Sequence, residues 1–150
     1  MNRAQIGVIG AGDCDARTLE LAENVGKCIA RRDGILICGA LGGVMEAASK
    51  GAKEENGTTL GILPGKKRDE SNPYIDIAVV SDLGEARNAL IARSSDVLIA
   101  VSGGYGTLSE IAMSLKMGKN VVVLESYWDI EGTYRVDNPE EAVDMAFGFL

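Results

Sequence analysis

The sequence contains no histidine, and this absence excludes several kinds of catalytic and metal site. Nucleophilic catalysis by Ser-His-Asp or Cys-His groups needs an imidazole, and so do many zinc sites. Acid–base chemistry therefore falls to aspartate, glutamate, lysine, tyrosine or cysteine side chains. The sequence predicts no metal site.

Cysteines are few, and long hydrophobic runs are absent. Cys14, Cys28 and Cys38 are an odd number without close pairing, which does not indicate a disulfide framework. Cys28 and Cys38 stand in apolar patterns that are typical of buried thiols. The first residues lead directly into a strand-like segment, with no signal peptide and no membrane span. We therefore expect a soluble cytoplasmic protein without a membrane partner.

Basic residues are also in the minority. The 150 residues include 15 Lys and Arg against 22 Asp and Glu, which gives a formal net charge of −7. Because binding to a phosphate backbone needs a basic face, we expect no nucleic-acid partner. Hydrophobic residues make up 46% and charged residues 25%, as in globular proteins. This length and composition predict a single domain over residues 1–150; the motifs below make it a nucleotide-binding one.

Short apolar runs alternate with helix-like segments along the chain. Strands are predicted at 6–9, 35–38, 58–63, 75–80, 97–101 and 121–124, with one more short strand at 134–136. Helices are predicted at 16–32, 44–53, 83–93 and 107–117, and after Asn138. This alternation predicts a doubly wound, mostly parallel α/β sheet of about six or seven strands in a Rossmann-like three-layer sandwich. Ligands bind such sheets at the carboxyl ends of the strands, so the loops there are candidate sites.

Glycine-rich loops follow the first two predicted strands. The first begins at Gly10 like a dinucleotide fingerprint but has Asp15 in place of its third glycine, which excludes an ordinary NAD site. Gly10 then marks either a tight turn or a ligand-facing loop. Gly42 and Gly43 in the second loop let the backbone approach either a ligand or a neighbouring helix.

The loop after the strand at 97–101 is the most informative, with residues 102–110 reading SGGYGTLSE. It enters a helix, where free backbone N–H groups and the helix dipole favour an anion. Gly103, Gly104 and Gly106 leave room for a phosphate. Thr107 and Glu110 also fit a Thr-x-x-Glu capping box, which needs no function. The spacing favours the cap for Glu110 and a phosphate site for the loop.

Arg87 lies on the predicted helix that precedes this loop. An arginine there either sits on a solvated face, with or without a surface ion pair, or turns its guanidinium toward the glycine loop. In the second case it would bind a phosphate or carboxylate through paired hydrogen bonds. The spacing alone leaves both interpretations open.

Three segments together resemble the Lonely Guy-like superfamily, whose members were once often labelled lysine decarboxylases. They are EARN at 85–88, SGGYGTLSE at 102–110 and GGVMEAA at 42–48. The family pattern is a helical Arg followed by Pro-Gly-Gly-x-Gly-Thr-x-x-Glu. Its best-known members are phosphoribohydrolases, which release the base and ribose 5-phosphate from cytokinin nucleoside 5′-monophosphates. The chemistry needs no histidine, because a carboxylate can stabilise an oxocarbenium-like sugar and activate water.

The resemblance implies roles for particular residues of this chain. Arg87 and Glu110 correspond to the functional Arg and Glu of the family pattern, and are the expected catalytic residues. The expected phosphate- or ligand-binding residues are Gly103, Gly104, Gly106, Thr107, Gly42, Gly43 and Gly10. No cofactor is implied for catalysis. A homodimer or a larger homo-oligomer is implied.

Several residues depart from the hydrolase pattern. Ser102 replaces the family proline, Asn88 stands where active enzymes usually have lysine, and Val-Met-Glu at 44–46 replaces Gly-Leu-Met-Gly. These changes look closer to the branch that includes the molybdenum-cofactor carrier proteins, which bind a phosphorylated pterin. We therefore expect a domain that binds a phosphorylated nucleotide-like or molybdopterin ligand at loop 103–107. The alternative is a nucleoside 5′-monophosphate phosphoribohydrolase.

Overall fold

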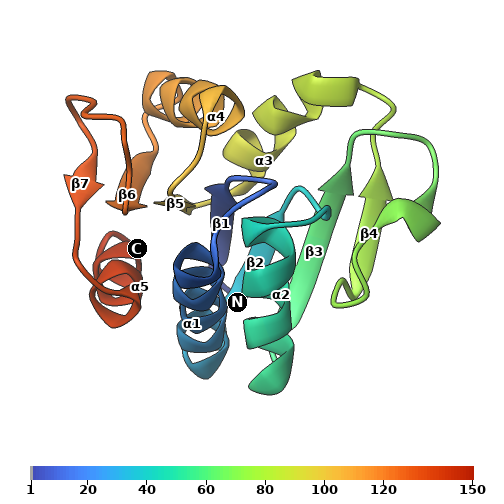
Figure 1. Ribbon diagram of the computed structural model, residues 1–150, viewed down its shortest axis with the longest axis horizontal. Coiled ribbons are helices and arrows are strands. Elements are labelled where there is room, and N and C mark those ends of the chain that lie inside the picture. Colours follow the sequence, from blue (N-terminus) through green and yellow to red (C-terminus); the bar gives the residue numbers. More distant parts are fainter. Residues whose placement is uncertain (1) are drawn as a thin grey trace.

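The computed structural model describes residues 2–150 and contains one seven-stranded parallel sheet with helices on both faces (Figure 1). The strands are β1 (Gln5–Gly10), β2 (Ile35–Cys38), β3 (Thr58–Leu63), β4 (Ile77–Val80), β5 (Val97–Val101), β6 (Asn120–Leu124) and β7 (Tyr134–Arg135). The helices are α1 (Ala16–Arg31), α2 (Val44–Glu54), α3 (Asn88–Ser94), α4 (Tyr105–Lys116) and α5 (Pro139–Gly148), with short 3₁₀ helices η1 (Arg68–Glu70) and η2 (Gly84–Arg87). The predicted fold class is confirmed.

The order of the strands fixes where a ligand can bind. The strands lie in the order β4-β3-β2-β1-β5-β6-β7, and every neighbouring pair is parallel. The chain builds outward from β1 to β4, returns beside β1 with β5, and then builds outward in the other direction to β7. This reversal leaves a crevice at the carboxyl ends of β1 and β5, where open α/β sheets bind their ligands.

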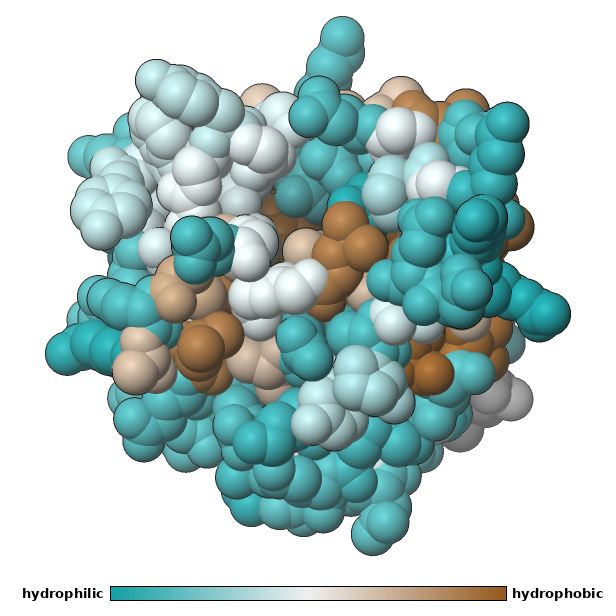
Figure 2. Space-filling view, turned by 45° about the vertical axis from the view of Figure 1, so that its right-hand side comes forward, coloured by the Kyte–Doolittle hydropathy of each residue, from teal (hydrophilic) through white to brown (hydrophobic). Residues whose placement is uncertain are grey.

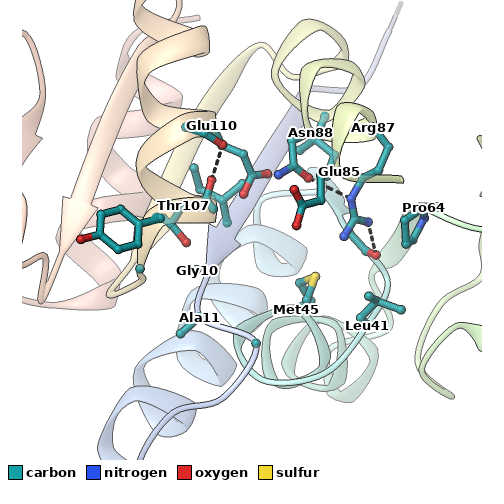
Figure 3. Close-up of a pocket in the computed structure, with 18 of the residues that line it drawn as sticks. Gly10, Ala11, Leu41, Met45, Pro64, Glu85, Arg87, Asn88, Thr107 and Glu110 are labelled. Carbon is teal, nitrogen blue, oxygen red and sulfur yellow. Dashed lines mark hydrogen bonds between the residues drawn. The ribbon is translucent and has the colours of Figure 1, made fainter. Parts of the chain in front are cut away.

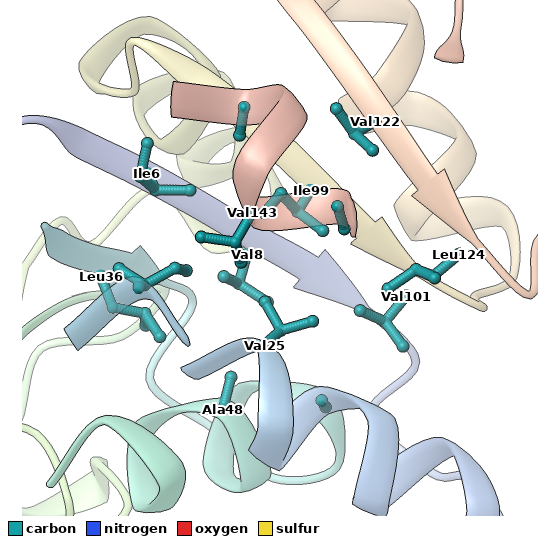
Figure 4. Packing of buried hydrophobic residues seen from close by; sticks show 14 of the residues in the cluster. Ile6, Val8, Val25, Leu36, Ala48, Ile99, Val101, Val122, Leu124 and Val143 are labelled. Carbon is teal, nitrogen blue, oxygen red and sulfur yellow. The ribbon is translucent and has the colours of Figure 1, made fainter. Parts of the chain in front are cut away.

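Two hydrophobic layers cover the sheet because its central strands alternate buried side chains between the two faces. Ile6 and Val8 of β1 pack with α1, α2 and α5, as Figure 4 shows, whereas Ile9 packs with α3 and α4 on the other face. The same alternation holds in β5, whose five residues are all buried. Strands buried on both faces are what the continuous apolar runs predicted.

Some predicted boundaries move. The predicted strand 75–80 begins at Ile77, because Asp76 turns its carboxylate to the backbone N–H and hydroxyl of Thr59 and to Lys53. The predicted helix 83–93 is divided into η2 and α3. The predicted cap of α5 is confirmed, since the Asn138 side chain accepts a hydrogen bond of 2.9 Å from the Glu141 N–H.

The three thiols are free, and Cys38 is completely buried. Burial raises the pKa of Cys14, Cys28 and Cys38. None of the helices within residues 2–150 combines the length and the apolar character that crossing a bilayer requires.

Candidate functional site

A cavity of about 760 Å³ opens at the carboxyl ends of β1 and β5, at the reversal of strand order (Figure 3). Its walls come from the loop after β1, the start of α2, the segment η2–α3 and the first turns of α4. Of the nine predicted site residues, six line the cavity: Gly10, Arg87, Gly104, Gly106, Thr107 and Glu110. The sheet therefore brings together residues that lie up to a hundred positions apart in the chain.

The glycine loop turns directly from β5 into α4. The helix begins at Tyr105 with Gly104 as its N-cap, two residues before the predicted start, and no side chain caps it. Gly103 has a φ of +117°, and a Cβ there would lie 2.3 Å from the Thr107 hydroxyl oxygen. The capping-box interpretation of Thr107 and Glu110 is therefore wrong. Both side chains are buried instead of capping a helix.

Gly104 and Gly106 differ from Gly103 in what surrounds them. A Cβ built on either residue meets no other atom within 4 Å, although both residues line the cavity. Neither glycine is needed to let parts of this chain pack together. They leave the first turn of α4 open, where backbone N–H groups have no partner inside the helix. This is the geometry that a bound anion uses at a helix N-terminus.

Glu110 projects from α4 into the cavity and is only 8% exposed. Burial raises its pKa from 4.5 to about 7, because a buried carboxylate loses its hydration, and the nearby Arg87 charge partly opposes this rise. A carboxyl group with that pKa can either hold or accept a proton near neutral pH. A pKa matched to neutral pH is common among catalytic acids and bases.

Arg87 stands at the junction of η2 and α3, on the opposite wall of the cavity from Glu110 (Figure 3). It is 8% exposed, so the solvated-face alternative is excluded. Its Nη1 donates to the carbonyl oxygens of Gly39 and Ile62, and its Nε donates to the Asn88 side chain. Within residues 2–150 these bonds engage three of the five N–H groups of the guanidinium. The two on Nη2 remain for a ligand.

The packing of the chain requires two of the predicted glycines, Gly10 and Gly43. A Cβ at Gly10 would lie 2.4 Å from the Val101 carbonyl oxygen, and one at Gly43, whose φ is +62°, would lie 2.2 Å from the Ala11 carbonyl oxygen. Gly43 lines a separate cavity of about 340 Å³ beside α1 and α2. Gly42 and Gly103 line neither of these two cavities.

Sequence reasoning missed several residues of the cavity wall, including Met45, Glu85 and Ser109. Sequence reasoning also missed Trp128, which does not line the cavity but holds the glycine loop. Its ring N–H donates to the Gly103 carbonyl oxygen at 3.2 Å, and its ring lies 5.6 Å from that of Tyr105. No sequence motif signals this contact, because Trp128 reaches the loop from the connection between β6 and β7.

A family model for the SLOG cluster4 family matches residues 3–146 of the chain. The chain belongs to the SLOG cluster4 family. This match, together with the relatives below, confirms the resemblance to the Lonely Guy-like superfamily. An uncharacterized protein of Archaeoglobus fulgidus is 52% identical, over 96% of this chain and 95% of its own.

Two other similar proteins carry functional names. The cytokinin riboside 5′-monophosphate phosphoribohydrolase LOG5 of Arabidopsis thaliana is 36% identical over 68% of this chain, but the matched region spans only 45% of LOG5. The molybdenum cofactor carrier protein of Chlamydomonas reinhardtii has a similar structure. Its TM-score is 0.92 with 36% identity, and the match covers 99% of this chain and 98% of the carrier. This structural similarity agrees with the sequence analysis, in which the departures from the hydrolase pattern indicated the branch that includes the molybdenum-cofactor carrier proteins.

The raised pKa of Glu110 predicts a pH dependence of stability. Between pH 4.5 and about 7 the folded chain keeps a proton on Glu110 that the unfolded chain has released, so stability falls as pH rises through this window. The effect is on the order of 3 kcal/mol. Thermal unfolding followed by circular dichroism at pH 5 and pH 8 should show a smaller loss of Tm for Glu110→Gln than for the wild type. Equal losses would contradict the burial of an ionisable Glu110.

Proposed function

We propose that the protein binds a small phosphorylated, nucleotide-like ligand, with the phosphate at the N-terminus of α4 between residues 103 and 107. The observation that carries this proposal is the open space above Gly104 and Gly106, two cavity-lining glycines that the packing of the chain does not require. A phosphate fills that space and accepts hydrogen bonds from the first N–H groups of α4.

The charges in the cavity suit a monoanion or dianion at the N-terminus of α4. The chain as a whole carries a net charge of −7, so a general attraction for anions is absent. The positive end of the α4 dipole and the free side of the Arg87 guanidinium supply the local attraction. Burial of Arg87 makes its contribution stronger than it would be in water.

The rest of the cavity is large enough for a ring system. Its volume of about 760 Å³ falls in the range of small-molecule sites, and its lining includes the apolar side chains of Val8, Ile9, Leu41, Met45 and Ile91. Both a nucleoside monophosphate and a phosphorylated molybdopterin combine a phosphate with such a ring system. Similarity to the molybdenum cofactor carrier over nearly the whole chain favours the carrier type of function.

A second candidate function is hydrolysis of nucleoside 5′-monophosphates, and the state of Glu110 favours it. A buried carboxyl with a pKa of about 7 faces the cavity across from Arg87. In the reaction the C1′–N bond breaks, the oxygen of water bonds to C1′, and Glu110 accepts a proton from that water. The base leaves with the bonding electron pair and takes up a proton. The carboxylate also stabilises the positive charge that develops on the sugar.

Ligand-dependent thermal stabilisation tests the proposed binding site. AMP, GMP, CMP, UMP and ribose 5-phosphate are titrated separately, with adenosine as the control without phosphate. At least one phosphorylated compound should raise Tm, because a ligand that binds only the folded state stabilises it. If none does, and the purified protein carries no bound molybdopterin by fluorescence of its oxidised pterin, the proposed function is wrong.

Gly106→Asp should abolish binding of the phosphorylated ligand at the glycine loop without lowering the stability of the protein. Residue 106 is the second residue of α4, where a carboxylate favours the helix dipole but repels a phosphate. We expect Tm without ligand to be unchanged or higher, and the ligand-induced increase to be lost. Gly148→Asp is the matched control, because Gly148 also lies in a helix with open space and does not line the cavity. Retention of the increase in Gly106→Asp would place the phosphate elsewhere.

A further inference from the structure

Two polar side chains line the cavity without taking part in the proposed phosphate site, namely Glu85 and Asn88. Glu85 belongs to η2, and Asn88 begins α3 three residues later. Side chains at this spacing lie on the same side of a helical segment. Figure 3 shows the Glu85 carboxyl group and the Asn88 amide group on the same wall of the cavity as Arg87. A ligand that fills the cavity therefore meets both groups together.

A hydrogen bond determines which atom of the Asn88 amide is left for a ligand. The Asn88 Oδ1 accepts from the Arg87 Nε at 2.9 Å, and the Arg87 guanidinium is itself held by two backbone carbonyl groups. The acceptor of the amide is therefore engaged. The Asn88 Nδ2, which can donate two hydrogen bonds, has no partner within residues 2–150. At this point the wall offers a donor.

The Glu85 side chain offers the opposite kind of group. A carboxylate accepts hydrogen bonds through two oxygens and donates none. In the part of the chain that the structure describes, no hydrogen bond or ion pair reaches this carboxylate, because the neighbouring Arg87 donates to Asn88 and to carbonyl groups instead. Glu85 is exposed, so only water has to leave when a ligand binds there. Two adjacent N–H groups of a ligand match its two oxygens.

This wall lies at a distance from the N-terminus of α4 that suits the length of a nucleotide. The helix α4 follows β5, whereas the carbonyl groups that hold Arg87 belong to Gly39, directly after β2, and to Ile62 in β3. In the order of strands, β2 and β3 lie two and three places from β5, which is about 10–14 Å. This span leaves room for a sugar or a short linker between a phosphate at α4 and a ring near Glu85.

The same part of the cavity provides an apolar surface for the faces of a ring. The side chains come from the loop after β2, the first turn of α2 and the end of β3, and they are Leu41, Met45 and Pro64. Figure 2 shows hydrophobic side chains around a hollow near the centre of the face that is turned forward, among mainly hydrophilic ones. A planar ring can pack on such side chains while its edge bonds to polar groups.

A donor beside a carboxylate discriminates between ring systems. Guanine and pterin share one edge, in which a carbonyl oxygen, a ring N–H and an exocyclic amino group stand in a row. The carbonyl oxygen suits the Asn88 Nδ2, and the two neighbouring N–H donors suit the Glu85 carboxylate. Adenine and cytosine place an unprotonated ring nitrogen beside the amino group, which a carboxylate repels. Hypoxanthine and uracil lack the amino group.

We propose that Glu85 and Asn88 determine the specificity of the site, and that they select a ring with the 2-amino-4-oxopyrimidine edge that guanine and pterin share. This inference rests on the proposed function, because the phosphate at α4 places the ring against the η2–α3 wall. It narrows the ligand to one class of ring by hydrogen bonds that the phosphate site does not make.

Isothermal titration calorimetry with GMP and with IMP tests the proposal, because these nucleotides differ only in the exocyclic amino group. The wild type should bind GMP at least about tenfold more tightly, or 1.4 kcal/mol, since a site that accepts hydrogen bonds from an amino group rejects a ligand without it. A second pair consists of 6-hydroxymethylpterin phosphate and its lumazine counterpart, in which oxygen replaces the amino group. The pair that binds more tightly identifies the source of the ring, and the preference is judged in that pair.

Glu85→Gln should remove most of this preference, because the amide nitrogen of glutamine cannot accept a hydrogen bond. The fold should not change, since Glu85 is exposed, and Tm without ligand checks this. The matched control is Glu20→Gln, which removes an exposed carboxylate of α1 outside the cavity and should keep the preference.

Equal affinities within the tighter pair, or a preference that Glu85→Gln retains, overturn the proposed specificity. The proposed function survives both results if Gly106→Asp still abolishes binding. Absence of binding by all four compounds also overturns the specificity, whereas the proposed function is then decided by the remaining compounds of its own test and by bound molybdopterin.

Discussion

Replacing Glu110 by glutamine is expected to abolish base release from nucleoside 5′-monophosphates, with a loss of at least about 100-fold if the protein is a phosphoribohydrolase. The amide keeps the size of the side chain and resembles its protonated form, but it can neither accept a proton from water nor stabilise a positive sugar. Because burial already holds a proton on Glu110 up to a pH of about 7, the fold should tolerate glutamine well. Chromatography of base and ribose 5-phosphate released from a panel of nucleotides measures the effect.

The control for this variant is ligand-dependent stabilisation, which should persist in Glu110→Gln because the phosphate lies at the loop and not at the carboxyl group. Release by the wild type that is lost in the variant assigns the hydrolysis to this site. Equal release by both proteins would remove Glu110 from the mechanism. No release by a folded wild type that still binds phosphorylated ligands would leave the carrier function.

Much of the fold could be predicted because local patterns and packing agree in it. The apolar run of β5 is buried on both faces, as a central parallel strand must be. Asn138 and Pro139 mark the start of α5 by chemistry that acts within a few residues. In each case the determining interactions either lie close in sequence or depend only on hydrophobicity.

The role of Glu110 could not be predicted from spacing, because a Thr-x-x-Glu pattern has the same form wherever the helix begins. The start of α4 at Tyr105 follows the left-handed turn at Gly103, which packs on Thr107 and accepts a hydrogen bond from distant Trp128. Arg87 was ambiguous for a similar reason. The carbonyl groups that hold its guanidinium belong to the end of β3 and the residue after β2.

The glycines show most clearly what sequence patterns cannot predict. The sequence does not tell which glycines are needed for packing and which leave room for a ligand. Gly43 is required by its positive φ and by the Ala11 carbonyl, whereas Gly106 meets nothing. Both stand in glycine-rich loops that follow strands. The contacts that distinguish them are formed only when β1, α2 and α4 come together.

The second large effect is expected at Gly26, where α1 crosses α2. A Cβ there would lie 1.9 Å from the Ala48 carbonyl oxygen and 2.9 Å from the Ala52 backbone nitrogen. Gly51 approaches the Glu23 carbonyl oxygen in the same way. Helix propensity alone predicts that Gly26→Ala stabilises α1 by about 1 kcal/mol. Here two backbones must move apart, so we expect destabilisation of about 3 kcal/mol or more.

Urea unfolding of Gly26→Ala measures this change, with Gly148→Ala as the matched control. Gly148 is also helical but has open space where the new methyl group would lie, so its replacement should leave stability equal or slightly higher. For a chain of this length the expected loss at Gly26 corresponds to a Tm lower by about 6–12 °C. A Gly26→Ala protein as stable as Gly148→Ala would mean that α1 and α2 are not in backbone contact. We would then have to abandon the conclusion that the Ala-rich helix α2 packs closely against α1. That packing supports one edge of the cavity, because α2 carries Met45.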